Sequence, residues 1–211
     1  MQRRMLMAAA CAMLVGGALA GATAQAQSSP RAAAGPARLR GTLEGVTETG
    51  IAMTTRAGAH VTVALSPQLR VALVVAAKIE DIRPNSYIGT AATAPQPDGS
   101  LRALEVSVFP PEMRGTGQGH FAWDLGEGSS MTNGTVGSLV GTSGRTMVVN
   151  YGSGEKRIVI PDDVPIVSVE PADRAALKPG TRIVVNGQRE AGGAVTAATI
   201  LVGKDGLTPP M

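Results

Sequence analysis

The sequence is poor in the residues from which many active sites are built. It holds one Cys and two His, and its aromatic residues are limited to one Trp, two Tyr and two Phe. The cysteine, Cys11, lies in an N-terminal segment that we expect to be removed, so the remaining chain would have no thiol. That excludes disulfides, thiolate metal sites and cysteine nucleophiles. Packing of aliphatic groups must therefore stabilise the fold.

The order of features at the N-terminus predicts this removal. Two arginines, Arg3 and Arg4, precede an apolar run from Met5 to Ala20, and Ala24-Gln25-Ala26 forms a small-x-small cleavage site. This is typical of a signal peptide over residues 1–26, cleaved after Ala26 or, alternatively, after Ala24. The apolar run is shorter than the roughly 20 strongly apolar residues of a membrane span. We therefore expect a periplasmic or secreted protein with no transmembrane span.

The charge balance gives no support to a nucleic-acid partner. The formal net charge is +3, and it falls to about +1 once Arg3 and Arg4 are removed. Barrels that hold single strands combine a basic groove with stacking aromatics. The repeated parts of this chain contribute only Tyr87 and Tyr151, and their basic residues are scattered among acids. We expect no nucleic-acid partner.

Residues 40–108 and 133–202 carry the same series of features in the same order. The matching pairs are GIAMTTRAG (50–58) with GRTMVVNYG (144–152), DIRPN (81–85) with ALKPG (176–180), and DGSLRALEVSV (98–108) with GGAVTAATILV (192–202). The first pair places Met53 and Met147 at the same position. Repetition at this spacing predicts two duplicated domains.

Within each unit the predicted elements are short and extended. In the first unit they lie near residues 41–46, 50–56, 60–65, 70–76, 86–93 and 101–108. One or two helical turns are predicted before Pro84 and before Pro179, because proline cannot continue a helix. In the last strand, alternation places Leu101 and Ala103 on one face and leaves Glu105 off it.

A three-strand meander, a helical turn and a final hairpin predict an OB-like Greek-key barrel, with Gly41 and Gly134 at bends of the first strands. The expected fold is thus all-β, with two tandem OB-like barrels and an ordered connector rich in aromatic residues and glycine. The expected divisions are a flexible N-terminal segment at 27–38, barrels at 39–109 and 133–203, a connector at 110–132, and a C-terminal tail at 204–211. The tail is expected to be poorly ordered unless it docks on the connector.

The chain resembles a secreted proteobacterial family of tandem OB-like proteins, of the type called domain of unknown function 5666. The residues that carry the resemblance are the RGT opening, IRPNSYIG, DGSLRALEVSVFPPEMRGTGQGH, WDLGEGSSMTNGTV, LKPGTRI and the GLTPPM end. The resemblance covers nearly the whole chain after residue 26 and implies a fold and an exported location, but no catalytic residues. Some relatives are labelled as a metal transporter permease. A permease needs several transmembrane spans, and none is predicted in this sequence, so we do not adopt that label.

The connector holds the candidate site. A surface for a ligand or for contact between the barrels is predicted there, and its members are Met113, Arg114, His120, Phe121, Trp123, Asp124 and Met131. In the simpler interpretation, Phe121 and Trp123 fill the groove between the barrels and fix their relative angle. Alternatively, His120 with Met113 or Met131 binds a copper-type metal.

No arrangement of nucleophile and base is apparent, so we expect no enzyme and no cofactor. The leading hypothesis is a non-enzymatic periplasmic binding or scaffold protein, with an envelope protein or polymer as a partner. The alternatives are the copper-type metal-binding protein and a hydrolase of unknown class. The sequence leaves the ligand, the oligomeric state and the orientation of the barrels open.

Overall fold

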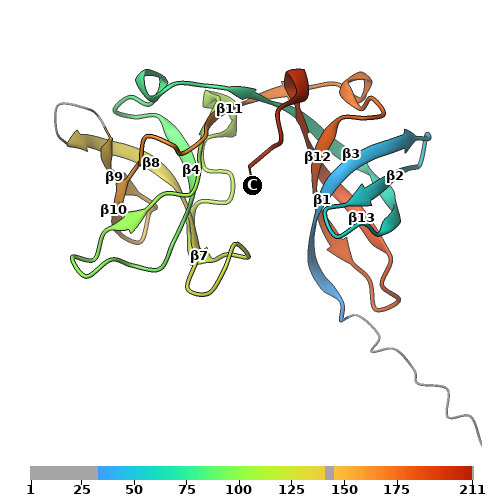
Figure 1. The fold of residues 1–211 in the computed structure, drawn as a ribbon, viewed down its shortest axis with the longest axis horizontal. Coiled ribbons are helices and arrows are strands. Elements are labelled where there is room, and N and C mark those ends of the chain that lie inside the picture. The colour runs from blue at the N-terminus through green and yellow to red at the C-terminus, as the bar shows by residue number, and fades with distance from the viewer. Residues whose placement is uncertain (1–32, 141–144, 211) are drawn as a thin grey trace, which may run out of the picture. The chain divides into compact units, whose positions relative to one another are not determined.

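The computed structural model describes residues 33–140 and 145–210, and β-strands dominate it (Figure 1). In these two ranges the only helical elements are single 3-10 turns, so the predicted all-β class is confirmed. The predicted signal peptide at 1–26 lies outside the described residues. Within the described part of the chain, no helix has the length and apolar character needed to cross a membrane.

Five strands close into the first ring, which we call barrel 1. They are β1 (Gly35–Val46), β2 (Gly50–Thr55), β3 (His60–Ala76), β12 (Arg182–Arg189) and β13 (Val195–Gly203). Their order is β13-β12-β1-β2-β3, and a parallel ladder between β3 and β13 closes the ring. The interior is aliphatic apart from Met53, which is fully buried. This is the strand order expected of an OB-like barrel.

A second ring, barrel 2, repeats this order with less regular strands. It consists of β4 (Tyr87–Ala92), β5 (Leu101–Arg102), β8 (Ser130–Val140), β9 (Thr146–Asn150) and β10 (Glu155–Val159). The order is β4-β8-β9-β10-β5, and the ring closes through a bridge between Ala92 and Ala103 and through the pairing of β4 with β6 (Val106–Phe109), which follows β5 in the sequence. Met147 is fully buried here, as Met53 is in barrel 1.

Each barrel takes strands from both sequence repeats, which corrects the expected strand composition of the barrels at 39–109 and 133–203. The first three strands of one repeat are completed by the last strands of the other. The exchange occurs because β3 does not end near residue 65. The ladder to β13 skips from Leu65 to Arg70, and Pro67, which has no N–H to pair, lies in this bulge. Beyond it, β3 runs on toward the other barrel.

The two crossing strands, β3 and β11 (Ile166–Ala172), pair with each other. Residues 71–76 are antiparallel to residues 167–172, and β11 also pairs in parallel with β6 (Val106–Phe109), the neighbour of β4. The hydrogen-bonded ladder therefore continues from one barrel to the other as one sheet. Val74 pairs with Val169, and each stands equally far before its repeat's proline, Pro84 or Pro179. The crossing thus has approximate two-fold symmetry.

Gly41 and Gly134 mark the same bend in the two first strands. A Cβ atom at Gly41 would lie 2.0 Å from the carbonyl oxygen of Thr54, and one at Gly134 would lie 2.3 Å from that of Asn150. A bulge follows each glycine, after Leu43 in β1 and after Val136 in β8. The close approach of two backbones explains why both positions are glycine.

Two of the 3-10 turns lie at the predicted places in the sequence, before Pro84 and Pro179, but each contributes to the barrel that the other repeat begins. The turns are η1 (Ile79–Asp81) and η3 (Arg174–Ala176). Ile82, which follows η1, packs in barrel 2, and Leu177, which follows η3, packs in barrel 1. Each turn therefore supplies an apolar residue to the interior of the barrel that the next strand joins.

Within the described residues, parts of both segments expected to be loose are held in the structure: residues 35–38 at one end and residues 204–209 at the other. β1 begins at Gly35, because residues 35–38 pair with residues 186–189 of β12, a partner distant in sequence. At the other end, a 3-10 turn, η4 (Lys204–Gly206), leads to Leu207, which packs against the buried cluster that includes Val74 and Val169. Pro209 is buried, and its carbonyl accepts a hydrogen bond from Arg56. The tail docks mainly on barrel 1 and the crossing strands.

Candidate functional site between the barrels

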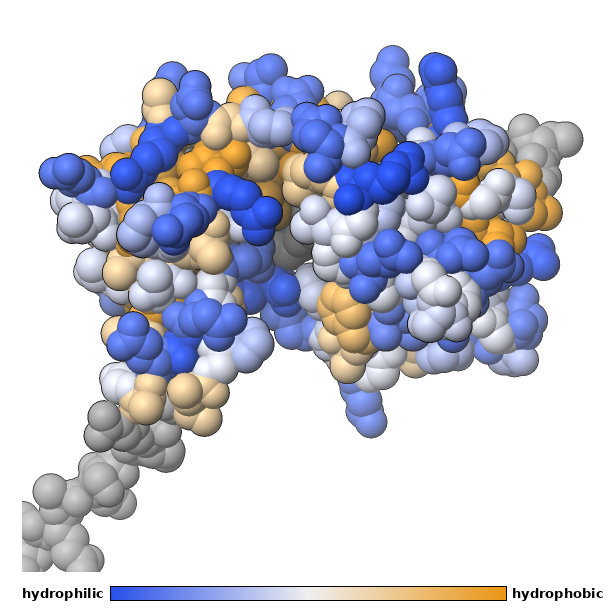
Figure 2. All heavy atoms as spheres, turned by 180° about the vertical axis from the view of Figure 1, so that it is seen from behind, coloured by the Kyte–Doolittle hydropathy of each residue, from blue (hydrophilic) through white to orange (hydrophobic). Residues whose placement is uncertain are grey.

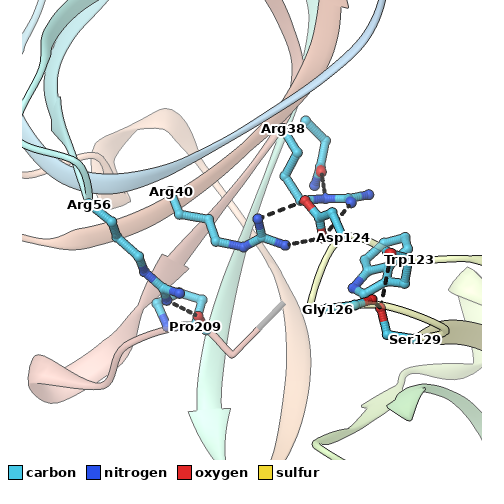
Figure 3. A network of polar contacts seen from close by, with 9 residues as sticks. Arg38, Arg40, Arg56, Trp123, Asp124, Gly126, Ser129 and Pro209 are labelled. Carbon is cyan, nitrogen blue, oxygen red and sulfur yellow. Dashed lines mark hydrogen bonds and ion pairs between the residues drawn. The ribbon is translucent and has the colours of Figure 1, made fainter. Parts of the chain in front are cut away.

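Trp123 of the connector contacts barrel 1 through Arg38. The guanidinium carbon of Arg38, on β1, lies 3.6 Å from the centre of the Trp123 ring (Figure 3). The Nε of Arg38 also donates a hydrogen bond of 2.9 Å to Oδ1 of Asn186, which is its neighbour on β12. A cation over an indole face is favourable, particularly where water is partly excluded. Arg38 therefore links the connector to two strands of barrel 1.

Asp124 forms the second link to β1. Arg40 donates two hydrogen bonds to its carboxylate, at 2.9 and 2.8 Å, and Arg38 lies 3.5 Å from the same group. The hydrogen bonds from Arg40 hold the pKa of the Asp124 carboxyl below its ordinary value. A bidentate arginine–carboxylate pair fixes orientation as well as distance. We call Arg38, Arg40, Trp123 and Asp124 the barrel clasp.

A tight turn after Asp124 positions the clasp. The backbone N–H of Trp123 donates to the carbonyl of Ser129, and the Ser129 hydroxyl lies within hydrogen-bond distance of the carbonyls of Trp123 and Gly126. Gly126 and Gly128 have positive φ, which other residues rarely adopt. The glycines of the connector therefore shape a defined turn rather than a free linker.

Glu105 is a buried acid beside the clasp that sequence alternation did not place there. It is 1% exposed, and neither carboxylate oxygen has a hydrogen-bond partner within residues 33–140 and 145–210. Burial raises the pKa of its carboxyl from 4.5 to about 7, although Arg40 and Arg38 act in the opposite direction. Alternation in the strand correctly predicted that Glu105 points away from the barrel interior. It could not show that β1 and the connector cover this outer face.

A cavity of about 490 Å³ adjoins the clasp through Asn186. Its walls come from barrel 1, from β11 and from the start of the connector. The lining residues are Leu69, Arg70, Val71, Ala72, Phe109, Met113, Thr116, Pro171, Ala172, Asn186, Thr199 and Leu201. Most of these side chains are apolar, and none is acidic. Met113 is the one predicted site residue in this lining.

The remaining predicted residues have separate surroundings. Arg114 donates to the backbone carbonyl of Asn85 and to Thr135. Phe121 is 41% exposed, with its ring centre 5.9 Å from that of Trp123. Phe121 therefore does not fill a groove, whereas Trp123 does make the contact between barrels.

His120 and Met131 do not share a site. In the pairing of β7 (Gly119–Ala122) with β8, His120 is opposite Thr132 and Phe121 is opposite Met131. Neighbouring residues of a strand point to opposite faces, so His120 and Met131 project from different sides. The Nδ1 of His120 lies 2.9 Å from the Thr132 hydroxyl, and burial lowers the pKa of its imidazole. Among the described residues, no cluster of three His, Cys, Asp or Glu side chains is placed to hold a metal.

Comparison with protein-family models, with curated proteins and with solved structures gives no match to this chain. The resemblance to the secreted tandem OB-like family stays a prediction. The candidate function therefore depends on the geometry of the cavity and the barrel clasp.

Proposed function

We propose that this chain is an exported binding protein that takes an apolar small molecule into the cavity between barrel 1 and the connector. The cavity carries this proposal. Its volume of about 490 Å³ lies in the usual range of small-molecule sites, and its lining is mainly apolar with a few polar groups. Phe109 supplies a flat apolar wall, and Met113 supplies an adaptable thioether.

The exposed surface offers less support for a broad docking face. On the side shown in Figure 2, hydrophobic residues form separate patches among hydrophilic ones. A large continuous apolar area is the usual mark of a protein or membrane contact. The cavity is therefore a better candidate than this face, and we favour a small ligand over the envelope polymer considered from the sequence.

The cavity is connected to the contact between the barrels through Asn186 and the barrel clasp. Asn186 lines the cavity, and its Oδ1 accepts the hydrogen bond of Arg38, which stacks on Trp123. A ligand that moves Asn186 changes the surroundings of the sole tryptophan. Fluorescence of Trp123 is thus a built-in reporter of occupancy.

A neutral fluorescent probe, N-phenylnaphthylamine, tests the proposal. It should bind the native protein with a change in Trp123 fluorescence, and Thr116→Phe should weaken that binding about ten-fold, which corresponds to about 1.4 kcal/mol. Thr116 is an exposed residue of the cavity lining, so a larger side chain fills space there without disturbing a barrel interior. Thr62→Phe, at an exposed position of β3 outside the cavity, is the matched control.

Two results would contradict the proposal. One is the absence of saturable binding by the native protein, and the other is equal binding by the Thr116→Phe and Thr62→Phe variants. Export is tested separately, by locating the tagged full-length chain in cell fractions and by sequencing the N-terminus of the processed protein. Recovery of an uncleaved chain from the cytoplasm would remove the exported location while leaving the cavity untouched.

A further inference from the structure

A row of polar side chains crosses four strands at one side of the cavity. Arg38 of β1 is in register with Asn186 of β12, Asn186 with Thr199 of β13, and Thr199 with Arg70 of β3. Residues directly opposite each other in a sheet have side chains on the same face. The row therefore forms a continuous polar strip on the outer face of barrel 1, and three of its members line the cavity.

The next row on the same face is apolar. Val184 of β12 is in register with Leu201, Leu201 with Ala72, and Ala72 with Pro171 of β11. Residues two apart in a strand point the same way, so this apolar strip lies beside the polar strip. Leu201, Ala72 and Pro171 also line the cavity. One wall of the cavity thus divides into a polar side and an apolar side.

The two arginines at the ends of the polar strip differ in their partners. Arg38 is stacked on Trp123 and paired with Asp124. The guanidinium of Arg70 has neither an ion pair nor a hydrogen bond with any residue that the structure describes. No lining residue carries a negative charge. Arg70 is therefore the cation open to an anionic ligand group.

We propose that the cavity binds a single-chain carboxylate amphiphile, a fatty-acid-like molecule, with its carboxylate at Arg70 and its chain along the apolar strip. This inference rests on the proposed function and adds the class of ligand. The guanidinium matches a carboxylate in a two-bond geometry. The hydroxyl of Thr199 and the amide of Asn186 supply further donors in the same row. Phe109 and Met113 complete the apolar surroundings of the chain.

The test compares laurate with dodecanol, which has the same chain length and an uncharged head. Titration calorimetry on the full processed chain, below the critical micelle concentration of laurate and below the solubility limit of dodecanol, should show laurate binding about ten-fold more tightly. Arg70→Gln should remove that preference and leave dodecanol binding unchanged. Arg102→Gln, which removes a cation from an exposed position of barrel 2, should change neither affinity. Thr199→Val should weaken laurate binding by a smaller factor.

The outcomes separate this inference from the proposed function. If dodecanol binds as tightly as laurate, or if Arg70→Gln and Arg102→Gln behave alike, the carboxylate assignment is wrong. Tighter binding of dodecyl phosphate than of laurate also overturns it. If neither amphiphile binds, the inference is wrong, while retained binding of N-phenylnaphthylamine keeps the proposed function. Loss of all three ligands removes both.

Discussion

Thr199 in barrel 1 and Glu105 in barrel 2 occupy the same place in the two sequence repeats, but their surroundings are opposite. Thr199 lines the open cavity. Glu105 is buried, with Arg38, Arg40 and Asp124 acting on its charge. The two repeats offer the same outer face twice, whereas the connector and its clasp occur once. One face is therefore covered and the other is left free to bind.

The barrels also differ in how they close. The ladder between β3 and β13 pairs residues from Ala64 to Val74 of β3, with one bulge. Its counterpart in barrel 2 is divided into two short ladders, one with the pairs Ile158–Leu101 and Val159–Arg102 and one that pairs residues 166–168 of β11 with residues 106–108 of β6. Fewer ladder bonds leave barrel 2 with the weaker closure, so local opening should begin there.

Matched core truncations test this difference with the largest expected effect. Met53→Ala and Met147→Ala each remove a fully buried side chain, and each should lower the free energy of unfolding by about 2–5 kcal/mol. Because barrel 2 closes less firmly, Met147→Ala should speed hydrogen exchange in β9 well before global unfolding. In Met53→Ala, the backbone amides of β2 should still exchange only through global unfolding of the protein. Equal exchange behaviour of β9 and β2 in the two variants would contradict the comparison.

Replacing Glu105 by Gln sharpens the contrast with Thr199. A raised pKa means that the folded chain holds the proton more tightly than the unfolded chain. The stability that this carboxyl contributes is therefore fully present below pH 4.5 and is lost as the pH rises to about 7. Glu105→Gln should raise the free energy of unfolding above pH 7 by about 3 kcal/mol.

Urea unfolding over this pH range measures the effect of Glu105→Gln. The same change at the exposed Glu127 of the connector serves as the control and should leave the profile unchanged. A wild-type protein whose stability does not fall between pH 4.5 and pH 7 would show that Glu105 is not held as described.

Trp123→Ala should have the smallest of the three effects. It removes the stacking of Arg38 and should cost about 1 kcal/mol of stability. Since β3 and β11 join the barrels in one sheet, the two barrels should not begin to tumble independently, contrary to what a flexible tether would allow. The change should instead speed proteolysis of residues 114–129. A scattering profile that shows separated barrels would contradict this expectation.

Local features of the fold were readable from the sequence because glycine and proline mark its turns. The predicted strands at 50–56 and 86–93 correspond to β2 and β4 within a residue at each end. Met53 and Met147, matched by the repeat, take equivalent buried positions. These outcomes depend on nearby residues, which alternation and turn chemistry report directly.

The exchange of strands between the two barrels could not be predicted from the sequence. Two similar hairpins are equally suited to complete either barrel, so strand patterns do not say which one closes which ring. The burial of Glu105 was missed for a related reason, because the groups around it come from β1 and the connector. The polar strip was also hidden, since Arg38, Asn186, Thr199 and Arg70 become neighbours only when barrel 1 closes.

The strand order of barrel 1 has a consequence for how the protein folds during its synthesis. Synthesis runs from the N-terminus, and domains generally fold as units when their residues have emerged from the ribosome. Barrel 1 cannot close before β13 has emerged, because β12 and β13 follow all the strands of barrel 2 in the sequence. In a nascent polypeptide, β1, β2 and β3 must therefore remain without their closing partners until β12 and β13 have been made.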